Sequence, residues 1–325
     1  MKLLRRNFLK LAGAVIATPA LPRRSSALDY PTRPTKIVAG FAAGGGVDIT
    51  ARLIGQWLAD HLGQPFVVEN RTGAGGNIGT EAVVNAAPDG YTLLLATVPN
   101  AVNASLYEKL NFNFVRDITP VAGVIRVPMV ALVHPSFPAK TIAELIAYAK
   151  ANPGKINMAS AGTGSAPHMA GELFNAMAGT QMVHVPYRGQ SQALTDLLGN
   201  QVQLLFAAAP GTADYIQTGK LRALGLRSPS QAATLKELPL VGSTLPGYEA
   251  SQWYGFAAPA GTPAEIVARL NREINAAFGD DAMKARLAAI SGDPMPGMPA
   301  DFGKLISDET DKWAKIVKSA GLKAE

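Results

Sequence analysis

The chain has 325 residues, of which 48% are hydrophobic and 17% are charged. That composition can fill sizeable cores and excludes a disordered protein, and the length suggests domains of about 150 residues each. Residues 1–27 carry six basic side chains and no acid, so the rest of the chain is formally neutral and offers no basic surface for nucleic acid. The absence of cysteine excludes disulfides, thiolate metal sites and cysteine nucleophiles.

Residues 1–27 have the layout of a cleaved export signal. A basic start precedes the apolar run at 11–17, and the small residues at 25–27 predict cleavage near Ala27. The sequence RRNFLK at 5–10 resembles a twin-arginine signal, and an ordinary secretory signal with two arginines is the alternative. The apolar run is shorter than the roughly 20 residues that span a bilayer. We therefore expect an exported, periplasmic protein.

Short apolar runs alternate with helical patterns from residue 35 onward. Helices are expected from Asp48 to near Gly63, after the capping box at 141–144, and after Thr262, with Pro263 as the first helical residue. Continuous apolar strands between helices predict an α/β fold with mostly parallel sheets flanked by helices. The expected strands are residues 35–41, 65–69, 91–96, 155–160, 183–185, 202–208, 221–226 and 252–258.

Two long extended stretches predict how the domains are divided. No linker composition separates them, which suggests that the chain crosses between domains more than once, at 121–133 and at 251–258. We place domain 1 at residues 28–127 plus 253–325 and domain 2 at residues 128–252.

Four expected strands end in loops that are rich in glycine. These loops are residues 42–46, 72–77, 161–166 and 186–190. A helix start presents unpaired N–H groups and a positive dipole end, and glycine lets a ligand approach the backbone closely. Such loops hold a carboxylate or a phosphate without a charged side chain, although tight turns alone also require glycine.

Nucleotide and catalytic motifs fail when their spacing is checked. The dinucleotide pattern would need glycine at Ile78 and at Pro167, and no Gly-Lys-Ser/Thr tripeptide occurs. Ser191 resembles a nucleophile elbow, but every histidine precedes it in the chain, which is the wrong order for that fold of hydrolases. His168 and Glu172 lie one helical turn apart and would supply at most two metal ligands. We expect no metal and no cofactor.

Four polar residues near these loops remain open to two interpretations each. Arg188 is either a partner for a ligand carboxylate or a surface arginine. His168 is either a ligand donor or a helix-start residue with a local hydrogen bond. Asp48 is either a helix-start acid or a group that positions a ligand or water, and Asp196 either is solvated or reaches a ligand or Arg188.

An ordered set of motifs resembles the Bordetella uptake gene family, the periplasmic receptors of tripartite tricarboxylate transporters. The resemblance runs from about residue 29 to the C-terminus. Its motifs are VAGFAAGGGVD at 38–48, VENRTGAGGN at 68–77, PDGYTL at 88–93, SAGTGS at 160–165, VPYRG at 185–189, LTDLL at 194–198 and APAGTP at 258–263.

The resemblance implies a two-lobed periplasmic binding protein of the Venus flytrap type, which closes on a small carboxylate. The first lobe would hold one carboxylate mainly through backbone amides, and loops of the second lobe would meet the other end of the ligand. Two positions depart from the family pattern, Val98-Pro99 and Gln190. The ligand contacts implied by these motifs, with Arg188 added from its chemistry, are Phe41, Ala43, Gly44, Gly45, Asp48, Thr97, Asn100, Ser160, Gly162, Thr163, Gly164, His168, Tyr187, Arg188 and Asp196.

The expected function is therefore a periplasmic receptor, monomeric and not an enzyme, which delivers a carboxylate to the membrane subunits of a tripartite tricarboxylate transporter. A secreted enzyme that processes carboxylates and a sensor accessory of a membrane kinase are the alternatives. The sequence does not separate uptake from sensing and does not name the acid.

Overall fold

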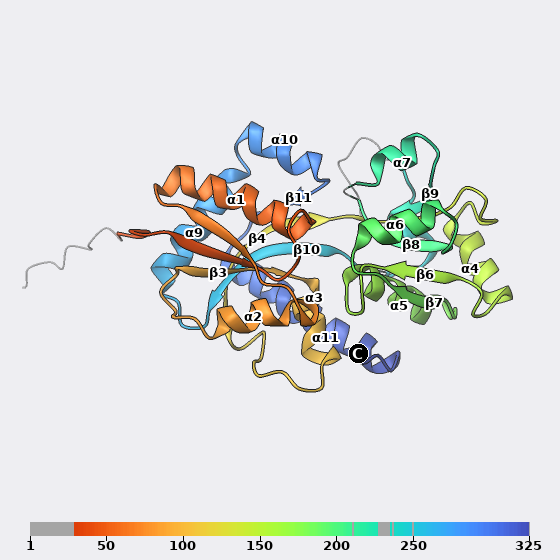
Figure 1. The fold of residues 1–325 in the computed structure, drawn as a ribbon, viewed down its shortest axis with the longest axis horizontal. Helices are drawn as coiled ribbons and strands as arrows, with labels where there is room; N and C mark the ends of the chain where they lie inside the picture. The colour runs from red at the N-terminus through yellow and green to blue at the C-terminus, as the bar shows by residue number, and fades with distance from the viewer. Residues whose placement is uncertain (1–28, 210, 227–234, 236, 249, 325) are drawn as a thin grey trace, which may run out of the picture.

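The computed structural model describes residues 29–324 except 210, 227–234, 236 and 249. The predicted leader at 1–27 lies outside these residues. The described chain forms two lobes side by side, each a β-sheet with helices on both faces (Figure 1). No helix within the described ranges is both long and apolar enough to cross a membrane.

The first lobe is built on a sheet of six strands, counted over the described residues, in the order β11-β4-β10-β3-β1-β2. Its helices α1, α9 and α10 lie over one face, and α2, α3 and α11 lie over the other (Figure 1). The bounds are β1 (Thr35–Ala39), α1 (Gly46–Leu62), β2 (Phe66–Asn70), η1 (Ala74–Gly76), α2 (Asn77–Val84), β3 (Thr92–Thr97), α3 (Val98–Leu106), β4 (Ile118–Val127), β10 (Gln252–Pro259), α9 (Ala264–Ala277), α10 (Asp281–Ala289), β11 (Asp293–Pro294) and α11 (Pro299–Ser319).

The second lobe is built on five strands in the described residues, in the order β7-β6-β8-β5-β9. Apolar side chains of α4, α5 and α8 pack on one face of this sheet, and those of α6 pack on the other. The bounds are β5 (Met129–Val133), α4 (Ile142–Ala151), β6 (Asn157–Ser160), α5 (Ala166–Ala178), β7 (Val183–Pro186), α6 (Gln190–Leu198), β8 (Leu204–Ala208), α7 (Ala213–Gln217), β9 (Arg222–Leu226) and α8 (Val241–Thr244).

Both sheets are flanked by helices, as expected, and both contain parallel and antiparallel pairs of strands. β1 pairs in parallel with β2 and β3, and β6 pairs in parallel with β7 and β8. β10 and β5, in contrast, pair antiparallel to all their neighbours. The reason is topological. These two strands begin at the junction of the lobes and run away from it, whereas the neighbouring strands end at that junction.

The chain passes between the sheets at the two extended stretches. Pro128 alone separates β4 from β5, and a proline cannot donate to a strand ladder. β10 brings the chain back, starting at Gln252. The long helix α11 then contacts both α3 in the first lobe and α5 in the second (Figure 1). One apolar cluster, which includes Phe174 and Trp313, is consequently shared by the two lobes.

Local capping is largely as the sequence predicts, with one correction. Thr141 caps α4 by accepting a hydrogen bond from the Glu144 amide at 3.1 Å. Pro263 is the N-cap of α9 and not its first helical residue. The Thr262 hydroxyl donates to the Pro259 carbonyl at 2.8 Å, so it stabilises the turn before the helix and does not cap it.

Candidate functional site: the interlobe cavity

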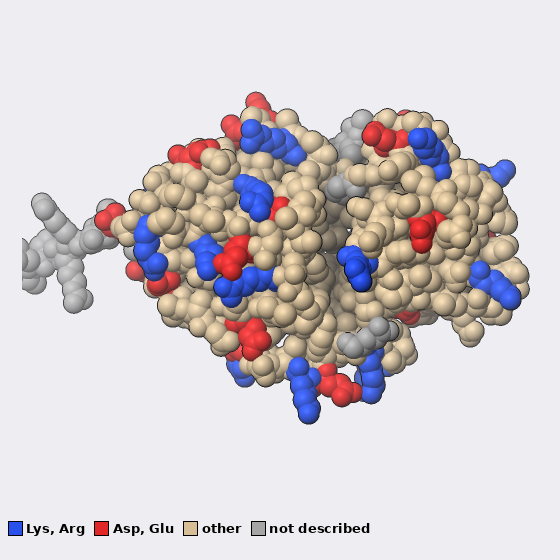
Figure 2. All heavy atoms as spheres, viewed as in Figure 1, with Lys and Arg blue, Asp and Glu red and all other residues tan. Residues whose placement is uncertain are grey.

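A cavity of about 610 Å³ lies between the lobes and is called the interlobe cavity below. The surface is hollowed at this junction, and the visible rim is mostly uncharged (Figure 2). Loops that follow β1, β3, β6, β7 and β8 contribute to its wall, so it lies at the carboxyl ends of strands, where α/β folds bind ligands. Among the described lining residues, Arg188 is the one that carries a charge.

The N-terminus of α1 forms the wall on the first lobe. Its N-cap, Gly45, offers no side-chain hydrogen bond, and the amides of Gly46 and Val47 in the first turn have no acceptor within the helix. These residues line the interlobe cavity together with Phe41, Ala43 and Gly44. The wall therefore presents N–H donors and a positive dipole end without a cationic side chain.

Asp48 lies behind this wall and is not among the cavity-lining residues. The residue is 3% exposed, and its carboxylate accepts hydrogen bonds from the Gly44 amide (2.9 Å), the Arg52 guanidinium (3.1 Å) and the Asn70 side-chain amide (3.0 Å). Burial raises the pKa of this carboxyl, but the bonds from Arg52, Gly44 and Asn70 outweigh burial and hold the pKa below its usual range. Asp48 thus remains charged and fixes the loop.

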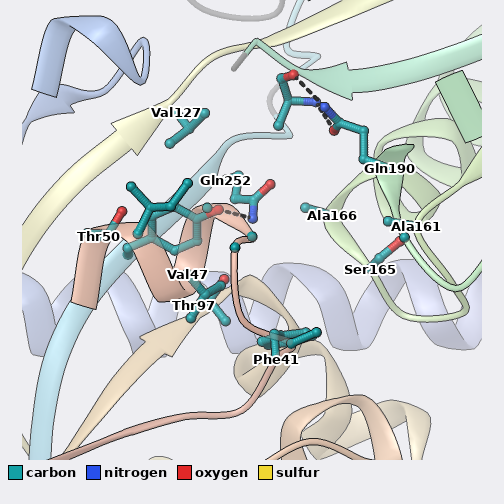
Figure 3. A pocket seen from close by; sticks show the side chains of 18 of the residues that line it. Phe41, Val47, Thr50, Thr97, Val127, Ala161, Ser165, Ala166, Gln190 and Gln252 are labelled. Atoms are coloured by element: carbon teal, nitrogen blue, oxygen red, sulfur yellow. Dashed lines mark hydrogen bonds between the residues drawn. The ribbon is translucent and has the colours of Figure 1, made fainter. Parts of the chain in front are cut away.

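Two threonine hydroxyls beside this wall are buried and have no hydrogen-bond partner among the described residues. They belong to Thr97, a predicted contact at 1% exposure, and to Thr50, at 0% exposure, which the sequence analysis did not select. Both residues line the interlobe cavity (Figure 3). An unpartnered buried hydroxyl costs free energy, so these groups are candidates to bond a ligand or an ordered water.

Asn100 was predicted as a contact but caps a helix. Its side-chain oxygen accepts from the Thr97 amide at 2.7 Å, and its amide donates to the Thr80 hydroxyl at 2.7 Å. It is buried and does not line the interlobe cavity. Its neighbour Pro99, at a position that departs from the family pattern, does line it.

The N-terminus of α6 faces the interlobe cavity from the second lobe. Its N-cap, Gly189, supplies no side-chain hydrogen bond, and Arg188 and Gln190 flank it in the cavity wall. The Gln190 side chain is bonded to Ala208 at the end of β8, donating to its carbonyl at 3.0 Å and accepting from its amide at 2.8 Å (Figure 3). Gln190 therefore joins the start of α6 to the end of β8.

In the loop at 160–168, unlike in the α1 wall, side chains of the loop itself accept hydrogen bonds from its backbone amides. The Gly162 amide donates to the Ser160 hydroxyl at 3.0 Å, and the Gly164 amide donates to Nδ1 of His168 at 3.0 Å. Ser165 caps α5 by accepting from the His168 amide at 3.4 Å. The predicted contacts Ser160, Gly162, Thr163, Gly164 and His168 do not line the interlobe cavity, whereas their neighbours Ala161, Ser165, Ala166 and Pro167 do.

His168 is 2% exposed and stacks on His184 with ring centroids 3.7 Å apart. Burial, with a smaller contribution from His184, lowers the pKa of His168 to about 3. Burial also lowers the pKa of His184 to about 4. Both imidazoles are therefore neutral at physiological pH. Of the two interpretations of His168, the structure shows the local hydrogen bond, which comes from the Gly164 amide. Glu172 lies 3.7 Å from His168, and no group of three potential metal ligands occurs in the described part of the chain.

Tyr187 and Asp196 bond to each other instead of facing the interlobe cavity. The Tyr187 hydroxyl donates to the Asp196 carboxylate at 2.6 Å, and neither residue lines the cavity. Burial and the bond to Asp196 raise the pKa of Tyr187 to about 12. The pair therefore ties β7 to α6.

Sequence reasoning did not select several residues that the fold brings to the cavity wall. Gln252 of β10 and Val127 at the end of β4 line the cavity (Figure 3). Tyr254, also of β10, lines it too. Val127 and Tyr254 have the apolar or aromatic character that is typical of buried strands, Gln252 is polar, and the pairing of the crossing strands places all three here. No local sequence signal marks them.

Comparisons with known proteins agree with the described geometry. The model of the tripartite tricarboxylate transporter family receptor matches residues 50–322. Protein BugT of Bordetella pertussis is 37% identical over 98% of both chains. Among solved structures, Rpa4515 of R. palustris with adipate has a TM-score of 0.82 at 35% identity, covering 91% of this chain and 99% of its own. MatC of Rhodopseudomonas palustris with bound malate has a TM-score of 0.78 at 30% identity, covering 89% and 100%.

The match to Protein BugT covers 98% of the chain and therefore extends over both lobes. The chain belongs to the family of tripartite tricarboxylate transporter receptors.

Proposed function

We propose that this protein is a periplasmic receptor that binds a small organic carboxylate in the interlobe cavity. The observation that carries the proposal is the pair of helix N-termini, α1 and α6, which line the cavity from opposite lobes without side-chain caps. Each N-terminus resembles roughly half a positive charge, and Arg188 adds a full one. With no carboxylate in the described lining, the site attracts an anion.

The known ligands of related proteins support the same chemical class. One relative was solved with adipate and another with malate, both of which carry two carboxylates. We propose that one carboxylate meets the α1 wall and that the other end of the ligand meets Arg188 and the start of α6. Phe41, Ala43, Gly44, Gly45, Thr97 and Arg188 would contact the ligand, and Asp48, Asn100, Ser160, His168 and Asp196 would hold the loops in place.

Release to the transporter requires that the receptor change state on binding. We propose that the lobes divide near residues 127 and 253 and close around the acid, after which the closed form delivers it to the membrane subunits. β4, β5 and β10, with α11, would be the connections about which they move. Closure requires that the acid bind the closed arrangement more tightly than the open one, since equal affinity for both would leave the equilibrium between them unchanged.

Export through a cleaved leader fits this role. We propose that residues 1–27 direct the chain to the periplasm and are removed near Ala27, and periplasmic relatives support that location. The test is mass spectrometry of the protein recovered from the periplasm. The measured mass should correspond to a chain that begins near residue 28. Mutation of both arginines at 5–6 to lysine should block export if the route is the twin-arginine one.

The binding test is a thermal-shift screen of the protein recovered from the periplasm and stripped of ligand. The panel holds malate, succinate, adipate, citrate, glutamate and benzoate. A ligand at 100 times its dissociation constant adds about 2.7 kcal/mol to stability, which raises the Tm by a few degrees. A clear shift with an acid of this panel, without consumption of that acid, supports a receptor, and consumption supports the alternative of an enzyme. No shift with any acid contradicts the proposal.

A further inference from the structure

The hydroxyl of Tyr254 lies in the wall of the interlobe cavity and donates no hydrogen bond to another described residue. The residue lies on β10, is 4% exposed and lines the cavity. Its hydroxyl accepts a hydrogen bond from the side-chain amide of Gln252 at 2.6 Å (Figure 3). An amide nitrogen only donates, so the phenol proton points elsewhere, and in the described part of the chain no acceptor is bonded to it.

This hydroxyl lies directly against the start of α1. A Cβ added at Gly46, the first residue of the helix, would lie 2.8 Å from the Tyr254 oxygen. The absence of a side chain at Gly46 therefore lets the phenol reach the uncapped amides of the first turn. Burial raises the pKa of Tyr254, so the hydroxyl keeps its proton throughout the physiological range.

The unpartnered hydroxyls of Thr50 and Thr97 lie in the wall of the same cavity. Both side chains are at least nine-tenths buried, which makes the missing hydrogen bonds costly. Backbone amides and hydroxyls thus occur together around one end of the interlobe cavity, and that arrangement suits an acceptor with several lone pairs.

We propose that the Tyr254 hydroxyl donates a hydrogen bond to the ligand carboxylate at the α1 wall, and that Gln252 is a positioning residue that fixes the direction of this bond. The inference rests on the proposed function and adds a contact to it. β10 also connects the lobes, and its register against β4 shifts between Tyr254 and Gly255. The bound acid would consequently bond to a strand that joins the two lobes.

The first test removes the hydroxyl alone. Tyr254→Phe should weaken binding about 10- to 100-fold, the range expected for one hydrogen bond to a charged group. The probe is the acid of the thermal-shift panel that binds the unaltered protein, measured by isothermal titration calorimetry. Tyr30→Phe is the matched control, because Tyr30 is also 4% exposed and its hydroxyl donates to the Gly90 carbonyl at 2.6 Å, away from the cavity.

The second test separates positioning from direct contact by a double-mutant cycle. Gln252→Leu should weaken binding when Tyr254 is present, and should have little further effect in Tyr254→Phe, because Gln252 would act only through the hydroxyl. Equal losses in both backgrounds would overturn the positioning role. Unchanged binding by Tyr254→Phe would overturn the contact itself. If the unaltered protein bound no acid of the panel, the proposed function and this inference would both fail.

Discussion

The α1 wall and the loop at 160–168 look alike in the sequence, and the structure separates them. Both follow a strand, contain several glycines and precede a helix. In the first, the N-cap has no side-chain bond and the first-turn amides face a cavity. In the second, Ser160, Ser165 and His168 accept the loop amides.

The difference shows that glycine content does not measure how many donors a loop offers to a ligand. A backbone amide is available only if no nearby side chain accepts its hydrogen bond. The serines and histidine of the second loop satisfy its amides internally, whereas the first loop has only Asp48, which accepts from Gly44. The two loops should consequently respond to substitution in different ways.

The largest effect is expected when the α1 wall is blocked. Gly45→Val should weaken acid binding more than 100-fold, because the new side chain would occupy the space in which a carboxylate approaches the amides. The fold should survive, since φ at Gly45 is −80° and a Cβ would meet only the Ala42 carbonyl, at 3.4 Å.

Gly199→Val is the matched control for this change. Its φ is −81°, a Cβ would meet the Thr195 carbonyl at 3.5 Å, and it lies away from the cavity. Titration calorimetry of both folded variants measures the difference. Binding by Gly45→Val at the affinity of the unaltered protein would exclude this wall as the carboxylate site.

Substitution in the loop at 160–168 should change how the stability of the fold depends on pH, and not the affinity for the acid. The pKa of His168 is about 3 in the fold and about 6.5 when unfolded, so protonation favours the unfolded chain. Its contribution is complete above about pH 6.5 and is lost as the pH falls toward 3, by about 2 kcal/mol at pH 5. Urea unfolding at pH 7 and pH 5 measures this loss.

His168→Asn keeps an acceptor near the Gly164 amide but removes the titrating ring. The fall in stability between pH 7 and pH 5 should shrink in this variant. His134→Asn, at a ring that bonds only its neighbour Ser136, should retain the full fall. A pH dependence unchanged by His168→Asn would show that another group controls it.

Removing the one described charge in the cavity wall should have a moderate effect. Arg188→Gln should weaken binding about 10-fold at low salt and by less at high salt, because the guanidinium is exposed and screened. Arg116→Gln, at an exposed arginine paired with Asp117 outside the cavity, is the control. An affinity that Arg188→Gln leaves unchanged at all salt concentrations would show that Arg188 does not contact the ligand.

The smallest effect is expected at Tyr187, which the motif resemblance placed in the site. Tyr187→Phe removes the bond to Asp196 but no described cavity-lining group, so the affinity should change less than about 3-fold. Stability should fall slightly, by about 1 kcal/mol for one hydrogen bond. A 10-fold or larger loss of affinity would move this residue into the ligand site.

Most strands were predictable from apolar runs, as at 91–96, which corresponds to β3, whereas the two-residue β11 has no such run and was not predicted. The cap of α4 was predictable because Thr141 and Glu144 interact within one turn. Strand direction was not, since the crossing of the chain between lobes decides it. Tyr254 and Thr50 escaped prediction because their place in the cavity wall depends on contacts between distant segments.

The most direct test of the account is a crystal structure with an acid of the panel bound. One carboxylate should lie within hydrogen-bond distance of the Gly46 and Val47 amides and the Tyr254 hydroxyl, and the other end of the acid should lie near Arg188 and the start of α6. An acid bound instead to the loop at 160–168, or outside the interlobe cavity, would contradict the account.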